Sequence, residues 1–160
     1  VAIVEREEEL EAALKDAFRY DEEVLVEEFI RGKELTVAVW GDAREAQAFP
    51  VIEITTVSGR YDYASKYTKG ASTHIIPARI PSEVTERVQQ LAVDAFRACG
   101  CRGVARADMM LGEDMTPYVI EINSMPGMTE TSLVPDAGRA MGVEFPELCE
   151  RILEMAGYEK

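Results

Sequence analysis

The sequence predicts an α+β fold in which an antiparallel sheet is flanked by helices. Two β-forming runs, Val104–Leu111 and Tyr118–Ile122, are separated by a turn-like stretch that contains Gly112 and Pro117, which is a hairpin signal. A long segment before this hairpin, Ser82–Cys99, carries apolar residues at helical spacing. A chain of 160 residues is long enough to bury a core, and we expect residues 1–160 to form a single domain.

The N-terminal region predicts the end of a strand at Val1–Val4, followed by a charged helix at Glu5–Tyr20. The acidic run Glu5–Glu9 suits a helix N-terminus, because the helix dipole favours negative charge there. Apolar residues recur along one face of this helix. They are Leu10, Ala13, Leu14, Ala17 and Phe18. We expect this helix to be structural.

Three strands are predicted next, as an antiparallel meander. Val24–Ile30 and Leu35–Gly41 flank a turn at Arg31–Glu34, and Gln47–Ile54 is the third strand. The segment that follows, Thr55–Arg79, has no clean periodicity and is rich in Gly, Ser, Thr and Tyr. Long segments of this kind are often binding loops or lids, and we expect one here.

Helices are predicted on both sides of the hairpin. For Ser82–Cys99 we expect Ser82 to cap the start, Gly100 to end the helix and Cys99 to fill the core. A second helix begins at Ser132–Leu133, and Phe145–Met155 is an amphipathic helix. The apolar face of the helix 82–99 consists of Val84, Val88, Leu91, Ala92, Ala95, Phe96 and Cys99.

The predicted hairpin brings four polar side chains to one face. If it is symmetric about Asp114–Met115, Arg106 lies opposite Asn123 and Asp108 lies opposite Glu121. The apolar residues Tyr118, Ile120 and Ile122 are then expected on the opposite face, in a core.

Asp108, Glu121 and Asn123 together predict a metal site. Two carboxylates and one amide oxygen form a donor set that Mg²⁺ commonly uses, with water and phosphate completing its shell. The positive charge of Arg106 beside them could stabilise a negative charge that develops during a reaction. The alternative is a solvated sheet face that carries a surface ion pair.

Composition narrows the classes of function. The formal net charge is −13, which argues against nucleic acid and anionic membranes as partners. We expect no membrane span and no signal peptide. The three cysteines lack metal-like spacing and are expected to be reduced thiols in a cytoplasmic protein. Because the chain begins with Val1 in the middle of a pattern, we expect it to be a fragment of a longer protein.

Several stretches together closely resemble the C-terminal part of the D-alanine–D-alanine ligases, which are members of the ATP-grasp superfamily. In chain order they read VLVEEFIRGKELTVAVWG, YDYASKYTKG, GVARADMML and YVIEINSMPGMTETSLVP. The resemblance covers essentially the whole chain. It implies the C-terminal lobe of an ATP-grasp fold, in a longer ligase whose N-terminal substrate domain and glycine-rich loop are absent from this sequence.

The resemblance also implies a reaction. ATP phosphorylates the carboxylate of a first D-alanine, and the amine of a second D-alanine attacks the acyl phosphate to form a dipeptide for peptidoglycan precursor synthesis. The implied cofactors are ATP and one or two Mg²⁺ ions, with Mn²⁺ as an alternative. The implied partners are ATP and D-alanine, and a homodimer is compatible with the full-length protein. We expect the isolated chain to be inactive.

Nucleotide-binding roles follow from the resemblance. It implies that Glu27 accepts a hydrogen bond from the adenine amino group and that Glu34 binds the ribose hydroxyls. Glu28, Phe29 and Ile30 would line the adenine slot. Without the resemblance, both glutamates would be interpreted as charges on an edge strand.

The other implied residues act at the phosphate and at the second substrate. Lys66 contacts phosphate and Tyr67 joins a hydrogen-bond network with the substrate, both in a lid at Tyr61–Lys69. Arg106 and Gly127 form an oxyanion site, and Ser132 and Leu133 hold the carboxylate of the second D-alanine. The chain departs from the family in this lid, with Ala64-Ser65 where Glu-Ala is usual and Arg60 where Phe is frequent. For Ser132, the alternative is an ordinary helix cap.

Three alternatives remain open from the sequence. The first is another ATP-grasp carboxylate–amine ligase with a different acceptor pocket. The second is a D-alanine–D-lactate ligase, although the pair Lys66–Tyr67 favours the D-alanine type. The third is a nucleotide-binding module without catalytic activity.

Overall fold

The computed structural model describes residues 1–56 and 72–157. The chain divides into two compact units, Val1–Ile30 and Arg31–Lys160. No helix among the described residues is long and apolar enough to cross a membrane.

The first unit contains one helix, α1 (Glu7–Ala17), and none of the residues of α1 is buried. The predicted helix is therefore confirmed, with shorter ends. The strands predicted at Val1–Val4 and Val24–Ile30 are wrong, because neither segment forms a strand in the structure. A strand needs a hydrogen-bonded neighbour, and no other strand pairs with either segment within the described residues.

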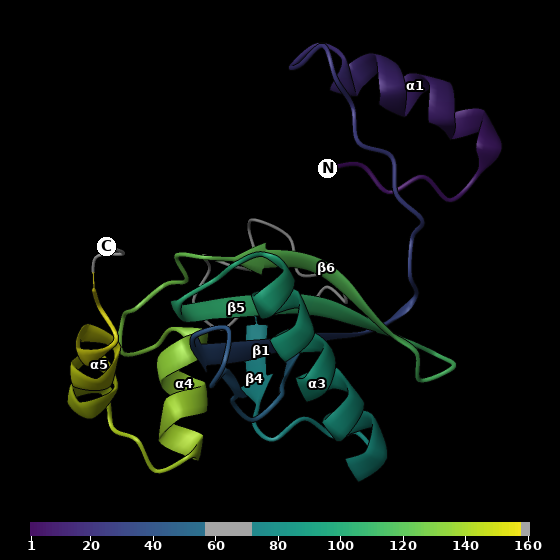
Figure 1. The fold of residues 1–160 in the computed structure, drawn as a ribbon. Helices are drawn as coiled ribbons and strands as arrows, with labels where there is room; N and C mark the ends of the chain where they lie inside the picture. The colour runs from purple at the N-terminus through teal and green to yellow at the C-terminus, as the bar shows by residue number, and fades with distance from the viewer. Residues whose placement is uncertain (57–71, 158–160) are drawn as a thin grey trace. The chain divides into compact units, whose positions relative to one another are not determined.

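The second unit is built on an antiparallel sheet, as the sequence predicts (Figure 1). Within the described residues its strand order is β4-β3-β1-β5-β6, and β2 pairs with β1. The strands are β1 (Gly32–Gly41), β2 (Gln47–Ala48), β3 (Ile52–Thr56), β4 (Ser72–Ile75), β5 (Gly103–Gly112) and β6 (Pro117–Asn123).

Two predicted strand boundaries are wrong. The ladder between β1 and β5 runs from Gly32–Gly112 to Gly41–Gly103, so Gly32 and Glu34 lie in a strand where a turn was predicted. The predicted strand Gln47–Ile54 is divided into β2 and β3. Pro50 lies at this division, and proline has no N–H to donate to a ladder. Part of the predicted loop Thr55–Arg79 instead forms β4 and the end of β3.

One face of the sheet packs against α3 (Ser82–Ala98). The core residues of β1 and β5 on this face are Leu35, Val37, Val39, Ala105, Ala107, Met109 and Leu111. The helix contributes Val84, Val88, Ala92, Val93 and Phe96. This core confirms the predicted helix and most of its predicted apolar face, and Figure 1 shows α3 lying across the sheet.

Gly100 follows the end of α3 as predicted, with a positive φ, but the predicted roles of Ser82 and Cys99 are wrong. Pro81 occupies the N-cap position and Ser82 is already helical, without a side-chain cap. Cys99 is exposed at the C-terminal end of the helix, so it does not fill the core. Cys101 packs against the core instead. Burial of Cys101, together with the nearby Cys99, raises the pKa of the Cys101 thiol.

The other face of the sheet packs against α4 (Leu133–Ala140) and α5 (Phe145–Glu154). Both predicted helices are confirmed. In this second core, Ala38 of β1 and Ile52 and Ile54 of β3 contact apolar residues of the two helices. The helical residues are Leu133, Val134, Ala137 and Leu148.

The hairpin of β5 and β6 has the predicted register up to a bulge. Arg106 pairs with Asn123 and Asp108 with Glu121, but Met109 pairs with Val119, which leaves Ile120 without a partner. Such a bulge reverses the alternation of side chains beyond it. Val119 and Ile122 therefore pack against the α3 core, whereas Tyr118 and Ile120 are exposed. The core position predicted for Tyr118 and Ile120 is wrong.

A buried ionic cluster closes the α3 face near β3. The carboxylate of Glu53 is 3% exposed and accepts hydrogen bonds from Lys33 Nζ at 3.1 Å and from the Arg79 main-chain N–H at 3.0 Å. Burial alone would raise the pKa of Glu53, but the hydrogen bonds from Arg79 and Lys33 outweigh it and lower the pKa. The cluster ties the start of β1 to the segment between β4 and α3.

Candidate active site

Arg106 and the three predicted metal ligands, Asp108, Glu121 and Asn123, lie on one face of the adjacent strands β5 and β6. Asp108 of β5 pairs with Thr36 of β1 on one side and with Glu121 of β6 on the other. Arg106 pairs with Ala38 and Asn123 in the same way. Ala38 belongs to the core under α4 and α5, so these residues share the sheet face that those two helices partly cover.

Arg106 and Asp108 form a bidentate ion pair at the centre of this face. Arg106 is 6% exposed, and it donates from Nε to Asp108 Oδ1 and from Nη2 to Asp108 Oδ2, both at 2.7 Å. A buried guanidinium needs such compensation, because removing it from water without a partner is costly. The sequence predicts the two residues on one face, but it does not predict this direct pairing.

Thr36 is a residue of this site that the sequence analysis missed. Its side chain is fully buried, and its Oγ1 lies 2.5 Å from Asp108 Oδ1 and 3.2 Å from the main-chain oxygen of Ala107. Contacts of this length between a hydroxyl and a carboxylate are strong, charge-assisted hydrogen bonds. The available signal was a single polar residue within the apolar run Leu35–Trp40.

Asp108, Glu121 and Asn123 carry carboxylate and amide oxygens, which are donor types that Mg²⁺ accepts. Glu121 is exposed, and Asn123 Oδ1 accepts a hydrogen bond from the Met125 N–H at 3.1 Å. No group of three or more His, Cys, Asp or Glu side chains among the described residues could hold a metal ion. Two carboxylates and an amide leave most coordination positions to water and phosphate, as is usual for Mg²⁺.

Gly127 and Ser132 lie close together in the segment after β6. A Cβ atom at Gly127 would be 3.0 Å from Ser132 Oγ, so a side chain there would crowd the serine. Ser132 occupies the N-cap position of α4, but its Oγ makes no cap hydrogen bond and accepts from the Thr129 N–H at 3.1 Å instead. Leu133 is buried in the second core, so only its main chain is suited to binding a carboxylate.

A second connection that the sequence did not reveal links β4 to α4. His74 Nδ1 lies 3.0 Å from Asp136 Oδ2, and Arg139 Nη1 donates to Asp136 Oδ1 at 2.8 Å. Arg139 Nη2 also donates to the main-chain oxygen of Glu130 at 2.8 Å. These contacts connect the edge strand β4 and the segment before α4 to α4.

The residues proposed for the nucleotide fall into separate parts of the chain. Glu34 lies in β1, where it pairs with Met110 and Ile54, and it is half-buried. Glu27, Glu28 and Phe29 are exposed in the first unit, and Ile30 is half-buried at its end. Lys66 and Tyr67, with the rest of the predicted lid Tyr61–Lys69, lie outside the described residues.

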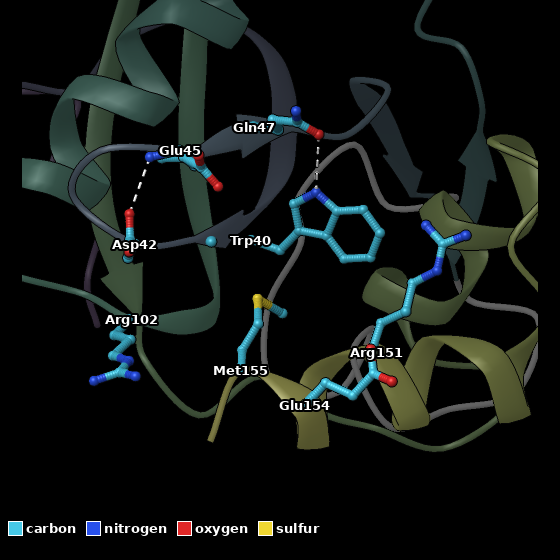
Figure 2. A pocket seen from close by; sticks show the side chains of 10 residues that line it. Trp40, Asp42, Glu45, Gln47, Arg102, Arg151, Glu154 and Met155 are labelled. Atoms are coloured by element: carbon cyan, nitrogen blue, oxygen red, sulfur yellow. Dashed lines mark hydrogen bonds between the residues drawn. The ribbon is translucent and has the colours of Figure 1, made fainter. Parts of the chain in front are cut away.

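A cavity of about 770 Å³ lies elsewhere, between the end of β1 and α5 (Figure 2). Trp40 packs edge-to-face on Phe49 with 4.9 Å between ring centroids, and Arg151 lies 5.4 Å from the Trp40 ring. The lining residues are Trp40, Gly41, Asp42, Glu45, Ala46, Gln47, Arg102, Arg151, Glu154 and Met155. None of the predicted site residues lines this cavity, so its size alone does not make it the candidate active site.

The antiparallel sheet with helices on both faces is the fold of the C-terminal lobe of ATP-grasp ligases. A family model described as "D-ala D-ala ligase C-terminus" matches residues 1–154, and the chain belongs to this family.

Relatives and solved structures agree with this assignment. A D-alanine–D-alanine ligase from Desulforudis audaxviator is 53% identical over 157 residues, covering 98% of this chain and 51% of the relative. The crystal structure of the Bacillus anthracis ligase complexed with ATP has a TM-score of 0.77 at 33% identity, covering 96% of this chain and 49% of the other. The VanG D-Ala:D-Ser ligase of Enterococcus faecalis has a TM-score of 0.78 at 36% identity, covering 94% and 43%. The chain thus spans about half the length of these proteins.

Proposed function

We propose that this chain is the C-terminal part of an ATP-dependent D-alanine–D-alanine ligase that acts in peptidoglycan precursor synthesis. The observation that carries the proposal is the side-by-side register of Arg106–Asn123 and Asp108–Glu121 on one sheet face. Both steps of the proposed reaction, phosphorylation of the first D-alanine and attack of the second on the acyl phosphate, develop negative charge on oxygen. A buried arginine beside two carboxylates and an amide is suited to binding that charge together with a metal ion.

Asp108, Glu121 and Asn123 are the proposed ligands of Mg²⁺, with Mn²⁺ as a substitute. When bound, the metal would neutralise charge on the phosphoryl group. Arg106 and the Gly127 main-chain N–H would then stabilise the oxyanion. Because the guanidinium is already ordered and buried, it needs little reorganisation for this role.

ATP is the proposed nucleotide, and the printed title of one neighbouring structure names ATP as its ligand. We assign the ribose to Glu34, the adenine to Glu27, Glu28, Phe29 and Ile30, and the phosphate contact to Lys66, with Tyr67 in the substrate network. These assignments rest on the family resemblance.

The carboxylate of the second substrate is assigned to Ser132 and Leu133, at the start of α4. Main-chain N–H groups at a helix N-terminus bind carboxylates well. D-alanine is the proposed second substrate, because curated relatives that are 53% and 47% identical to this chain are named D-alanine–D-alanine ligases. D-serine is a second candidate, since the VanG D-Ala:D-Ser ligase, at 36% identity, is about as similar to this chain as the Bacillus anthracis ligase, at 33%. A cytoplasmic location and a homodimeric full-length protein are further parts of the proposal.

The metal and nucleotide roles are tested by measuring ATP binding to the chain by calorimetry, with and without Mg²⁺. Glu121→Gln should weaken binding in the presence of Mg²⁺ by about tenfold and leave metal-free binding nearly unchanged. Glu113→Gln, in the exposed turn of the same hairpin, is the matched control and should bind like the unmodified chain. Equal weakening with and without Mg²⁺ would exclude Glu121 as a metal ligand. Absence of any Mg²⁺-dependent nucleotide binding by the unmodified chain would contradict the proposed function of this chain.

A further inference from the structure

The hydrogen bonds of Asp108 are distributed unequally between its two oxygens. Oδ1 accepts from Arg106 Nε at 2.7 Å and lies 2.5 Å from Thr36 Oγ1, whereas Oδ2 accepts only from Arg106 Nη2, at 2.7 Å, among the described residues. A carboxylate oxygen has two lone-pair positions. Both positions on Oδ1 are therefore used, and one on Oδ2 is left.

The Thr36 hydroxyl is well placed to impose this asymmetry. It is fully buried and belongs to β1, the neighbour of Asp108 on the side opposite β6 and Glu121. The Ala107 main-chain oxygen, at 3.2 Å, is its other possible acceptor. One hydroxyl hydrogen favours the shorter contact to the charged acceptor, because charge-assisted hydrogen bonds are the stronger ones. Thr36 thus draws Oδ1 toward β1.

We propose that Thr36 is a positioning residue that fixes the Asp108 carboxylate so that Oδ2 is the single oxygen offered to a divalent cation. The inference rests on the proposed function, because it takes Asp108 as a metal ligand. It adds that Asp108 ligates through one oxygen only and that a residue of a different strand selects which one. Residues that hydrogen-bond to a metal ligand and orient it commonly affect metal affinity almost as much as the ligands themselves do.

The test measures Mn²⁺ binding to the chain in the presence of ADP, by electron paramagnetic resonance of free Mn²⁺. Thr36→Val removes the hydroxyl and keeps the branched shape, and it should weaken Mn²⁺ binding by about tenfold. Thr36→Ser keeps a hydroxyl and should restore most of the affinity. ADP binding without metal should be the same in all variants. A merely structural role of Thr36 would not produce this difference between metal-dependent and metal-free binding.

Thr55→Val is the matched control, because Thr55 lies in β3 of the same sheet and, within the described part of the chain, its hydroxyl bonds only to the main-chain oxygen of Thr73, at 3.3 Å. It should change Mn²⁺ affinity less than twofold. Mn²⁺ affinity of Thr36→Val within twofold of the unmodified chain would overturn the inference and leave the proposed function intact. Failure of the unmodified chain to bind Mn²⁺ with ADP would contradict the proposed function itself. A crystal structure with Mn²⁺ should show it on Asp108 Oδ2, and ligation through both oxygens would also overturn the inference.

Discussion

The two compact units of the chain carry the same kind of amphipathic pattern but bury it to different extents. In the first unit, α1 has no buried residue, and Phe18, Leu25 and Val26 are 55%, 81% and 65% exposed. In the second unit, α3 buries five residues against the sheet, and α4 and α5 cover the other face. An apolar stripe thus predicts that a partner surface exists, but not that the same chain contains it.

The difference in burial between the two units suggests how the chain is organised into domains. Exposed apolar residues in a segment without its own core mark a surface that another part of a protein covers. Because the chain spans about half the length of its relatives, we propose that the first unit is completed by other parts of a longer ligase. In that proposal, residues 1–160 are the C-terminal part of the ATP-grasp domain.

The largest expected effect concerns catalysis. The isolated chain should form no detectable D-alanyl-D-alanine when it is incubated with ATP, Mg²⁺ and D-alanine. Residues of this chain are proposed for the second D-alanine and the metal, but none is proposed for the first D-alanine. The residues proposed for adenine belong to the first unit, whose helix α1 has no buried residue. Loss of substrate positioning can raise a barrier by about 7–11 kcal/mol.

Mass spectrometry of the reaction mixture is the measurement for this prediction, with a complete ligase as the positive control. Dipeptide formed by the isolated chain at a rate close to that of the complete enzyme would contradict this prediction. It would show that residues 1–160 alone are sufficient for catalysis.

Truncation of one phenylalanine in each unit should have very different effects on stability. Phe96 of α3 is fully buried, and Phe96→Ala should lower the free energy of unfolding by about 3–5 kcal/mol. Phe18 is 55% exposed, and Phe18→Ala should change it by less than about 0.5 kcal/mol. Urea unfolding followed by Trp40 fluorescence is the measurement, because the single tryptophan lies in the second unit. Comparable losses in the two variants would mean that Phe18 belongs to a cooperative core.

A smaller effect on folding stability is expected at acid pH, and it should concern only the second unit, which contains Glu53. The pKa of Glu53 is lowered in the folded chain relative to its usual value of 4.5. Glu53 therefore contributes stability that is present above pH 4.5 and is lost as the pH falls through its lower folded pKa. Glu53→Gln should remove this part of the acid dependence.

The measurement is the urea midpoint of Trp40 fluorescence between pH 7 and pH 3, in buffers of constant ionic strength. Glu113→Gln, at an exposed turn, is the control and should keep the acid dependence of the unmodified chain. An identical pH dependence in Glu53→Gln and the unmodified chain would rule out Glu53 as the source.

Local patterns in the sequence were sufficient for much of this fold. The turn between Leu111 and Pro117 fixes the pairing of its flanking strands, so Arg106, Asp108, Glu121 and Asn123 could be placed on one face. The bulge at Ile120 could not be foreseen, because a regular alternation gives no sign of an unpaired residue. The strand predicted at Val24–Ile30 failed for a related reason, since β-propensity does not supply a partner strand.

Contacts between residues distant in sequence were also beyond prediction. Thr36 and Asp108 meet only because β1 pairs with β5. His74 meets Asp136 only because α4 packs on the sheet to which β4 belongs. The sequence contains each of these residues, but their pairing depends on the topology of the sheet. The predicted roles of Lys66 and Tyr67 remain predictions, because both residues lie outside the described part of the chain.

Amide hydrogen exchange of the 160-residue chain, read by mass spectrometry, is the most direct test of the contrast between the two units. Protection reports the free energy of local opening, which is high where hydrogen bonds are covered by a core. The central strands β1 and β5, together with α3, should exchange slowly, and peptides from residues 1–30 should exchange orders of magnitude faster. Protection of residues 1–30 equal to that of β5 would show that the first unit is stable by itself and would contradict the account.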